Sequence, residues 1–88
     1  MNLIYTTQFK KDYKKIKKQQ KNLSKLKSVI EKLLSQKKLE PKYRDHSLSG
    51  NFKNHRECHI EPDWILIYRK TKDELILERT GSHSDLFK

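Results

Sequence analysis

The chain has 88 residues, a length that predicts one small domain spanning residues 1–88, with a core too small for a multidomain enzyme with a large cofactor cleft. It carries 21 lysines and arginines against 11 aspartates and glutamates, a formal net charge of +10. Leucine, isoleucine, valine and phenylalanine amount to 22 of the 88 residues. This share exceeds the roughly 20% below which a highly charged chain stays unfolded, so the composition allows a folded domain.

The N-terminal half predicts one strand followed by two helices. Residues 3–5 favour a short strand, and Thr6 or Thr7 is suited to cap the next element. Phe9, Tyr13 and Ile16 recur at helical spacing among lysines, and after a break at residues 21–22 a second apolar stripe runs over residues 23–34 and ends before Pro41. So short a break predicts a helical hairpin.

Positive charge is concentrated on these two helices. Residues 1–44 hold 14 basic and 3 acidic side chains, a net charge of +11, whereas residues 45–88 hold 7 basic and 8 acidic ones, a net charge of −1. Lysine produces a diffuse field that attracts a polyanion without reading its sequence. A solvated helix face is the alternative interpretation. The overall pI of about 9.8 favours nucleic acid as the partner.

The C-terminal half predicts a three-stranded antiparallel meander. Residues 42–51 carry turn chemistry and indicate a loop, after which strands are expected at 52–60, 64–70 and 75–80 with short linkers between them. The predicted fold class is α+β, with the helices packed on one face of the sheet. No element remains to cover the other face.

Strand alternation predicts where the polar residues lie. His55, Glu57 and His59 fall on one side of their strand, with Arg56 and Cys58 on the other. Two histidines and a glutamate on an uncovered sheet face are unusual for a purely structural role. A single face therefore becomes the candidate site.

Several kinds of site and location are not favoured. Cys58 is the only cysteine, so neither an internal disulfide nor a multi-thiolate zinc site is expected. In an extended strand His55 and His59 lie about 13 Å apart, too far to share one metal, and there is no glycine-rich phosphate loop. We expect no metal and no cofactor. The absence of a long apolar run or a signal segment predicts a cytoplasmic protein without membrane contact.

Three segments resemble the RelE/ParE superfamily of small bacterial toxins, in its YafQ-like branch of messenger RNA endonucleases. They are DHSLSG at residues 45–50, ECHIEPDWILIY at 57–68 and ERTGSHSDLF at 78–87. The resemblance covers the whole chain in element order. It implies a RelE-like fold and a ribosome-dependent toxin that cleaves messenger RNA and is neutralised by a cognate antitoxin. A small acidic protein would complement the positive surface.

The resemblance also implies a set of cleavage residues, and each is present: His46, His59, Asp63, Trp64, Arg79, His83 and Phe87. Metal-independent RNA cleavage requires a base for the 2′-hydroxyl, an acid for the leaving 5′-oxygen and a cation for the phosphate. Histidine suits both proton transfers near neutral pH. The sequence leaves open which histidine takes which role, and local turn or surface roles for His46, Asp63 and His83 are the alternatives.

Arg79 is expected to stabilise the phosphate because it stays protonated. Strict alternation would group Arg79 with Leu75 and Leu77, and a bulge near Glu78 would remove this conflict. Trp64 and Phe87 are expected to stack on RNA bases, with core packing as the alternative for Trp64 and a C-terminal hydrophobic clasp for Phe87. Lys53 and Arg56 are further predicted substrate contacts.

Two other functions remain open at this point. The first is a ParE-like toxin that binds DNA gyrase and cleaves nothing, and the second is an RNA-binding module in which the histidines are incidental. The histidine set argues against the first, because a pure binding module does not need three imidazoles on one face.

Overall fold

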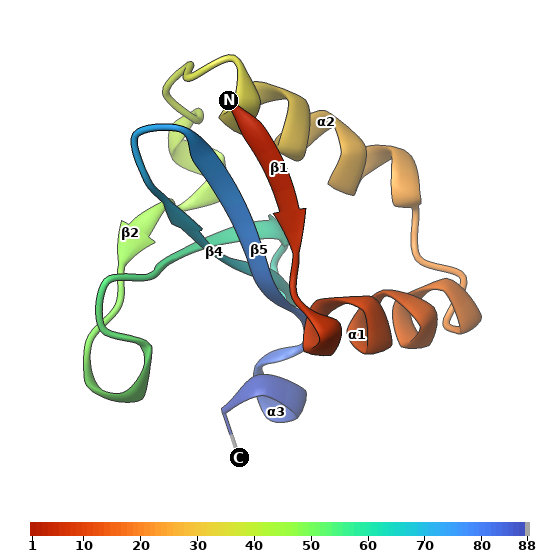
Figure 1. The fold of residues 1–88 in the computed structure, drawn as a ribbon. Coiled ribbons are helices and arrows are strands. Elements are labelled where there is room, and N and C mark those ends of the chain that lie inside the picture. Colours follow the sequence, from red (N-terminus) through yellow and green to blue (C-terminus); the bar gives the residue numbers. More distant parts are fainter. Residues whose placement is uncertain (88) are drawn as a thin grey trace.

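The computed structural model describes residues 1–87 as an α+β fold built on one mixed sheet (Figure 1). In the order of the sheet the strands are β1 (Asn2–Tyr5), β5 (Glu74–Gly81), β4 (Trp64–Lys70), β3 (Arg56–Glu61) and β2 (His46–Ser47). Strand β1 runs parallel to β5, and the other neighbours are antiparallel. The meander predicted for the C-terminal half is confirmed, and the sheet gains a strand at each edge.

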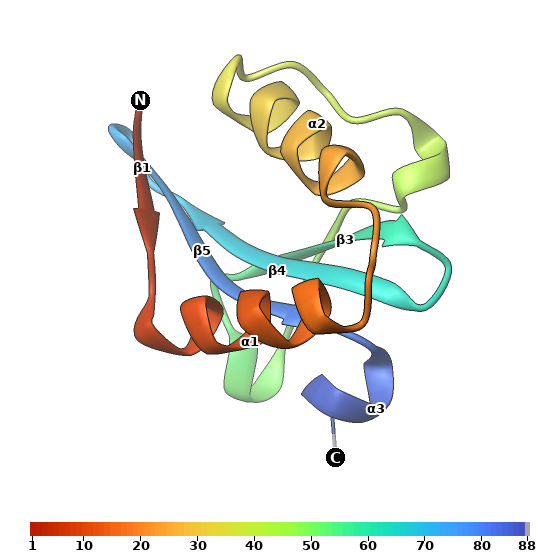
Figure 2. The same cartoon turned by 90° about the vertical axis from the view of Figure 1, so that its right-hand side faces the viewer.

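The predicted helices form and lie on the same face of the sheet (Figure 2). Helix α1 (Thr7–Lys18) begins after Thr6, whose hydroxyl accepts a hydrogen bond from the backbone N–H of Phe9. Helix α2 (Leu23–Leu34) begins after Asn22, whose side chain accepts one from Ser24. Helix α1 packs against β5 and α2 against β3. The helices therefore form a looser pair than the predicted hairpin.

An apolar groove of about 920 Å³ separates the two helices. Its walls include Phe9 and Tyr13 from α1 and Leu23, Ile30 and Leu34 from α2. The main core lies between the helices and the sheet, where the apolar face of each helix meets the strands. Its buried members are Phe9, Ile16, Leu26, Val29, Leu33, Leu39, Cys58, Ile60, Trp64, Leu66, Tyr68, Leu75 and Leu77.

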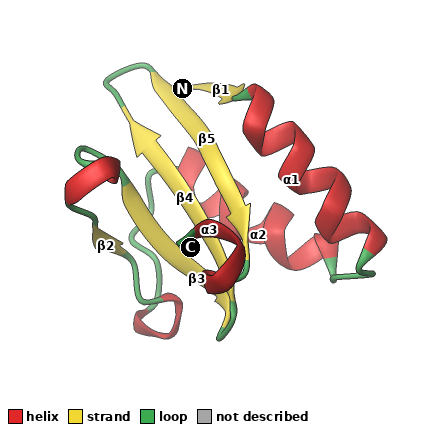
Figure 3. Ribbon diagram, turned by 90° about the horizontal axis from the view of Figure 1, so that it is seen from below, coloured by secondary structure: helices red, strands yellow, loops and turns green. Residues whose placement is uncertain are grey.

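The opposite face of the sheet is partly covered, contrary to the prediction. Helix α3 (His83–Leu86) follows β5 and turns back under the sheet (Figure 3), so that Leu86 packs on Ile65 and Ile67. The 3-10 helix η2 (Gly50–Phe52) adds Phe52 to this second cluster. The C-terminal segment is thus an ordered part of the fold.

Two predicted boundaries are wrong for local reasons. Strand β3 begins at Arg56 rather than at Phe52, because η2 and a left-handed residue at Asn54 precede it. The predicted loop at 42–51 contains the short strand β2 as well as the 3-10 helix η1 (Pro41–Tyr43), which ends in a left-handed Arg44. Both features depend on tight turns whose backbone angles apolar patterning does not reveal.

No helix among residues 1–87 combines the length and the apolar character needed to span a lipid bilayer.

Candidate active site

Glu57 occupies the centre of the polar cluster on the second face of the sheet. Its side chain comes from the middle of β3, and the residue is only 4% exposed. One carboxylate oxygen, Oε2, lies 3.0 Å from Nε2 of His46 and 3.6 Å from Nε2 of His59. The other oxygen, Oε1, is buried without a hydrogen-bond partner among residues 1–87. A buried acid that serves two imidazoles through a single oxygen is unusual outside functional sites.

His46 reaches Glu57 because β2 pairs with β3 in a register that sets the two residues opposite each other. The Nδ1 atom of His46 lies 2.6 Å from the carbonyl oxygen of Arg44, and Nε2 faces Glu57. Both ring nitrogens thus face oxygen atoms. Two arrangements satisfy them: a charged imidazolium beside a carboxylate, or a neutral imidazole beside a protonated Glu57.

A second ion pair anchors the segment that carries His46. Asp45 accepts hydrogen bonds from Nε and Nη2 of Arg56, each at 3.3 Å, and from the hydroxyl of Tyr68. Asp45 raises the pKa of Arg56, and burial together with Asp45 raises the pKa of Tyr68. These bonds tie the short strand β2 to the main sheet. They fix the position of His46 over Glu57.

His59 and His83 extend the cluster along the sheet. The ring centroids of His46 and His59 are 6.5 Å apart, and those of His59 and His83 are 5.9 Å apart. Nδ1 of His59 lies 3.2 Å from the carbonyl oxygen of Pro62, and the backbone N–H of His83 donates to the carboxylate of Asp63 at 3.2 Å. Asp63 therefore holds the first turn of α3. It stands next to the histidines without binding an imidazole.

Two aromatic rings, Phe87 and Phe52, extend the row of histidine rings beyond His83. Phe87 is 40% exposed, and its ring centroid lies 5.3 Å from that of His83 and 5.7 Å from that of Phe52. The ring of Phe52 also meets His55, whose Nε2 lies 3.3 Å from Glu78. Phe87 thus packs against its neighbours and still presents apolar surface to solvent.

A bulge at Glu78 turns Arg79 toward this face. Ile67 pairs with Arg79, but the next residue, Tyr68, pairs with Leu77, so β5 contains one extra residue. Cross-strand partners share a face, and Arg79 therefore lies in the row that also holds Ile67, Glu57 and His46. This bulge removes the conflict with strict alternation that the sequence left unresolved at Arg79.

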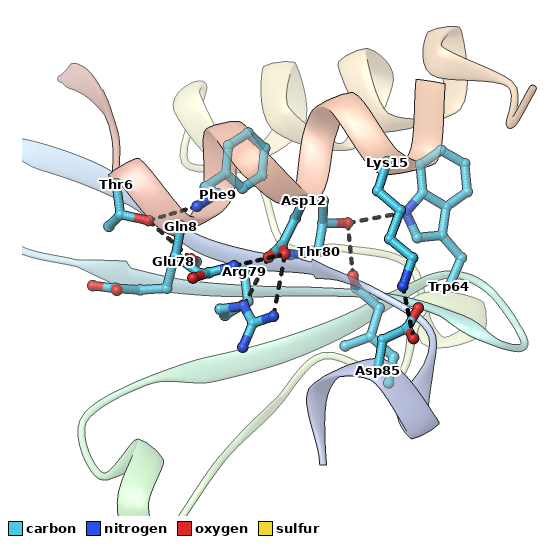
Figure 4. A network of polar contacts seen from close by, with 11 residues as sticks. Thr6, Gln8, Phe9, Asp12, Lys15, Trp64, Glu78, Arg79, Thr80 and Asp85 are labelled. Atoms are coloured by element: carbon cyan, nitrogen blue, oxygen red, sulfur yellow. Dashed lines mark hydrogen bonds and ion pairs between the residues drawn. The ribbon is translucent and has the colours of Figure 1, made fainter. Parts of the chain in front are cut away.

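The guanidinium of Arg79 is bound to Asp12 of helix α1 (Figure 4). Nε of Arg79 donates to one carboxylate oxygen at 2.7 Å and Nη2 to the other at 3.1 Å, which raises the pKa of Arg79. Asp12 engages two of the five N–H bonds of Arg79, and three remain for another acceptor. Strand β4 lies between Arg79 on β5 and Glu57 on β3. At a strand spacing of ~4.8 Å, the Cα atoms of these two residues are about 10 Å apart.

A cleft of about 610 Å³ opens beside His59. Basic side chains line it, with Lys25 from α2 and Lys42 and Arg44 from the segment before β2. Such a lining is suited to a phosphate backbone. The cleft leads from the lysine-rich half of the molecule to the histidine cluster.

The structure corrects one predicted substrate contact and leaves two others as predictions. Trp64 is 0% exposed in the main core, where its indole N–H donates to Thr80, so no base can stack on its ring. Arg56 lies opposite Tyr68 and is paired with Asp45, but its side chain is 42% exposed, so a substrate contact stays a prediction. Lys53 is exposed at the end of η2, where a substrate contact stays a prediction.

Asp12 is missing from the sequence-based prediction, and Glu57 appears there only on the polar face, without a role in cleavage. Alternation places Glu57 beside His59, so the pairing of this acid with a histidine on one face was an available signal. Asp12 is the one acidic residue in a helix crowded with lysines. No group of three or more histidine, cysteine, aspartate or glutamate side chains among residues 1–87 is arranged to hold a metal ion.

Comparison with known proteins shows the family of this chain. A family model described as the bacterial toxin YafQ of type II toxin–antitoxin systems matches residues 1–88. The messenger RNA interferase toxin YafQ of Escherichia coli strain K12 is 44% identical over 87 residues, which cover 98% of this chain and 95% of the relative.

Solved structures give the same result for the fold. The Escherichia coli DinJ–YafQ complex contains a chain with a TM-score of 0.92 and 42% identity, at 99% coverage of this chain and 98% of that chain. A copper-bound mutant toxin from Helicobacter pylori has a TM-score of 0.94 and 44% identity, at 99% coverage of both chains. Fold and site thus define a small toxin of the RelE/ParE type. The chain belongs to the YafQ family of type II toxin–antitoxin systems.

Proposed function

We propose that this protein is the toxin of a type II toxin–antitoxin pair and that it cleaves messenger RNA on the ribosome by acid–base catalysis at the histidine cluster. Residues 1–88 act as one domain in the cytoplasm, without a metal or other cofactor. The observation that carries the proposal is the sharing of Oε2 of Glu57 by His46 and His59, with His83 next in line.

The reaction proposed is attack by a ribose 2′-hydroxyl on the adjacent phosphorus. One imidazole removes the hydroxyl proton, the P–O5′ bond breaks, and a second group protonates the leaving 5′-oxygen. The products are a 2′,3′-cyclic phosphate and a 5′-hydroxyl. Two proton-transfer groups within reach of one phosphate are sufficient for this chemistry, and the cluster holds three imidazoles.

The hydrogen bonds suggest how the roles divide. His46 shares a proton with Glu57 because both of its ring nitrogens face oxygen atoms, which suits it to donate to the leaving oxygen. The ring nitrogens of His83 have no hydrogen-bond partner among residues 1–87, which suits that ring to accept the 2′-hydroxyl proton. His59 lies between them and stabilises the negative charge that develops on the phosphate in the transition state. Asp63 acts on the reaction by holding His83.

The remaining residues bind and orient the RNA. Arg79 supplies a permanent positive charge and three unused N–H bonds for the phosphate. Phe87 offers an exposed ring for an unpaired base, and Lys53 an exposed charge. The lysines of α1 and α2 bring the toxin to ribosomal RNA, whose phosphates need no sequence-specific contact.

A cognate antitoxin is part of this proposal. A small acidic protein would complement the +10 surface, and it would block cleavage by covering the histidine face or by displacing α3 with His83.

The decisive experiment combines purified toxin with ribosomes that are translating a defined messenger RNA, and maps the 5′ ends of the products against the reading frame. We expect cleavage that persists in EDTA, is not enhanced by added copper and is lost in His83→Ala. The matched control is His55→Ala, because His55 lies near the same face but is paired with Glu78 outside the proposed set. Intact messenger RNA with the unmodified toxin would refute the proposed endonuclease activity. Equal cleavage by His83→Ala would refute the role proposed for His83. DNA damage with intact messenger RNA would indicate a gyrase-binding toxin.

A further inference from the structure

Asp12 differs from the other polar residues of helix α1 in being acidic and buried. It is the only acidic residue between Thr7 and Lys18, where six lysines surround it in the sequence, and it is 8% exposed. A buried carboxylate in so basic a helix must be matched by specific donors, because leaving it unpaired would cost several kcal/mol.

The donors come from three places (Figure 4). Arg79 contributes Nε at 2.7 Å and Nη2 at 3.1 Å, Thr80 contributes its backbone N–H at 3.1 Å, and Gln8 contributes its side-chain amide at 3.2 Å. Thr80 is itself fixed, because its hydroxyl donates to the carbonyl of Ile65 and accepts from Trp64. Asp12 thus joins α1 to the rigid part of β5, directly after the bulge.

Arg79 needs such an anchor. An arginine side chain has four rotatable bonds, and the bulge at Glu78 interrupts the ladder beside it. The two-point bond to Asp12 occupies one edge of the planar guanidinium and so fixes the direction of the remaining N–H bonds. A nearby acid, Asp85, is kept occupied by Lys15 at 3.0 Å and therefore competes less for Arg79.

We propose that Asp12 is a positioning residue for cleavage, which sets the guanidinium of Arg79 in the orientation that receives the scissile phosphate. The inference rests on the proposed function, because it assumes that Arg79 acts on that phosphate. Asp12 itself does not touch the RNA. Helix α1 therefore has two roles, since its lysines attract RNA while its single acid orders the site.

The test is a double-mutant comparison of Asp12→Asn, Arg79→Gln and the double variant. The rate measured is single-turnover cleavage of ribosome-bound messenger RNA at saturating toxin, expressed per folded molecule, with ribosome affinity measured separately. Asp12→Asn should lower the rate by about 10- to 100-fold, as a small misplacement of a catalytic group does, and leave ribosome affinity unchanged. Glu31→Gln, which removes the same charge from an exposed position of α2, should retain the full rate.

The double variant separates a positioning role from a structural one. If Asp12 acts through Arg79, adding Asp12→Asn to Arg79→Gln should cause no further loss of rate. An equal loss in both backgrounds would overturn the inference, since the effect would then not pass through Arg79. A full rate in Asp12→Asn together with a slow Arg79→Gln would also overturn it while leaving the proposed function intact. A full rate in Arg79→Gln would remove the phosphate role of Arg79 and the inference with it.

Discussion

The hydroxyl of Tyr68 donates a hydrogen bond to the carboxylate of Asp45, the residue immediately before His46. Tyr68 is buried under the helices, so this bond connects the main core to the strand that carries a proposed catalytic histidine. The stability of the core and the position of His46 are therefore coupled.

Tyr68→Phe tests this connection. We expect the free energy of unfolding to fall by about 1 kcal/mol, because one buried hydrogen bond is lost while the ring still packs. For a domain of this size that loss corresponds to a fall of about 4–8 °C in Tm. Cleavage per folded molecule should also fall, since β2 is held less firmly. A lower Tm with an unchanged cleavage rate would show that Arg56 alone suffices to hold Asp45.

Glu57→Gln tests the shared carboxylate. The amide keeps the shape of the side chain but replaces the carboxyl group whose Oε2 faces His46 and His59, so cleavage should fall by about 10²- to 10⁴-fold, the usual contribution of acid–base catalysis. The control is Glu61→Gln on the same strand, whose carboxylate pairs with Lys25 at the surface. The measurement is the single-turnover cleavage rate of both variants. Equal rates for Glu57→Gln and Glu61→Gln would exclude a role for Glu57 in cleavage.

Cys58 predicts a pH dependence of stability. Burial raises the pKa of its thiol to about 12, whereas the unfolded thiol has an ordinary value near 9. Because the folded-state pKa is the higher one, this contribution is complete below pH 9 and is lost as the pH rises. The free energy of unfolding should fall by about 1 kcal/mol between pH 9 and 10.

Chemical denaturation at several pH values measures this effect, and Cys58→Ala should remove the part due to the thiol. A thiol reagent at pH 8 should label the folded protein only as fast as it opens. Rapid labelling of folded protein would contradict the buried, protonated thiol.

The two aromatic residues implied by the resemblance should differ in their effects. Trp64→Phe removes the donor to Thr80 and should reduce stability by about 1–3 kcal/mol, with cleavage per folded molecule unchanged. Phe87→Leu should keep most of the stability but weaken RNA binding, because stacking on a base contributes about 1–3 kcal/mol. Ribosome titrations combined with thermal unfolding distinguish them. A binding defect confined to Trp64→Phe would reverse the assignment.

Lysines on α1 should control docking. Lys14→Gln with Lys18→Gln removes two exposed charges from this helix and should weaken ribosome binding. The slope of log affinity against log salt should decrease by about 0.7–0.9 for each lysine that contacts a phosphate. Lys70→Gln with Lys72→Gln, at the turn between β4 and β5, is the control of equal charge. Equal losses from both pairs would indicate a response to net charge alone.

Local patterning predicts most of the fold. The second helix and strand β4 have the predicted bounds, because each has a clear apolar period and polar flanks. Alternation also places Glu57 and His59 on one face, and the conflict that it leaves at Arg79 is removed by the bulge that the structure contains. These features depend on residues close together in the sequence.

The missed features depend on distant partners. The parallel pairing of β1 with β5 leaves no local signal, and α3 is too short for apolar periodicity to reveal it. Trp64 follows a turn and fits either face by composition, and its burial depends on packing between the helices and the sheet. Asp12 lies 67 residues before Arg79, and nothing in either segment indicates that they meet.

The edge strand β1 also determines when the protein can become active. Asn2 is opposite Glu74, so the ribosome must add 72 residues after the first partner before the second exists. At 5–20 residues per second this interval lasts roughly 4–14 s. Throughout it the nascent chain has neither β5, with the bulge that presents Arg79, nor the turn that carries His83. On the proposed function, a nascent chain therefore cannot cleave messenger RNA before β5 and α3 have been synthesised.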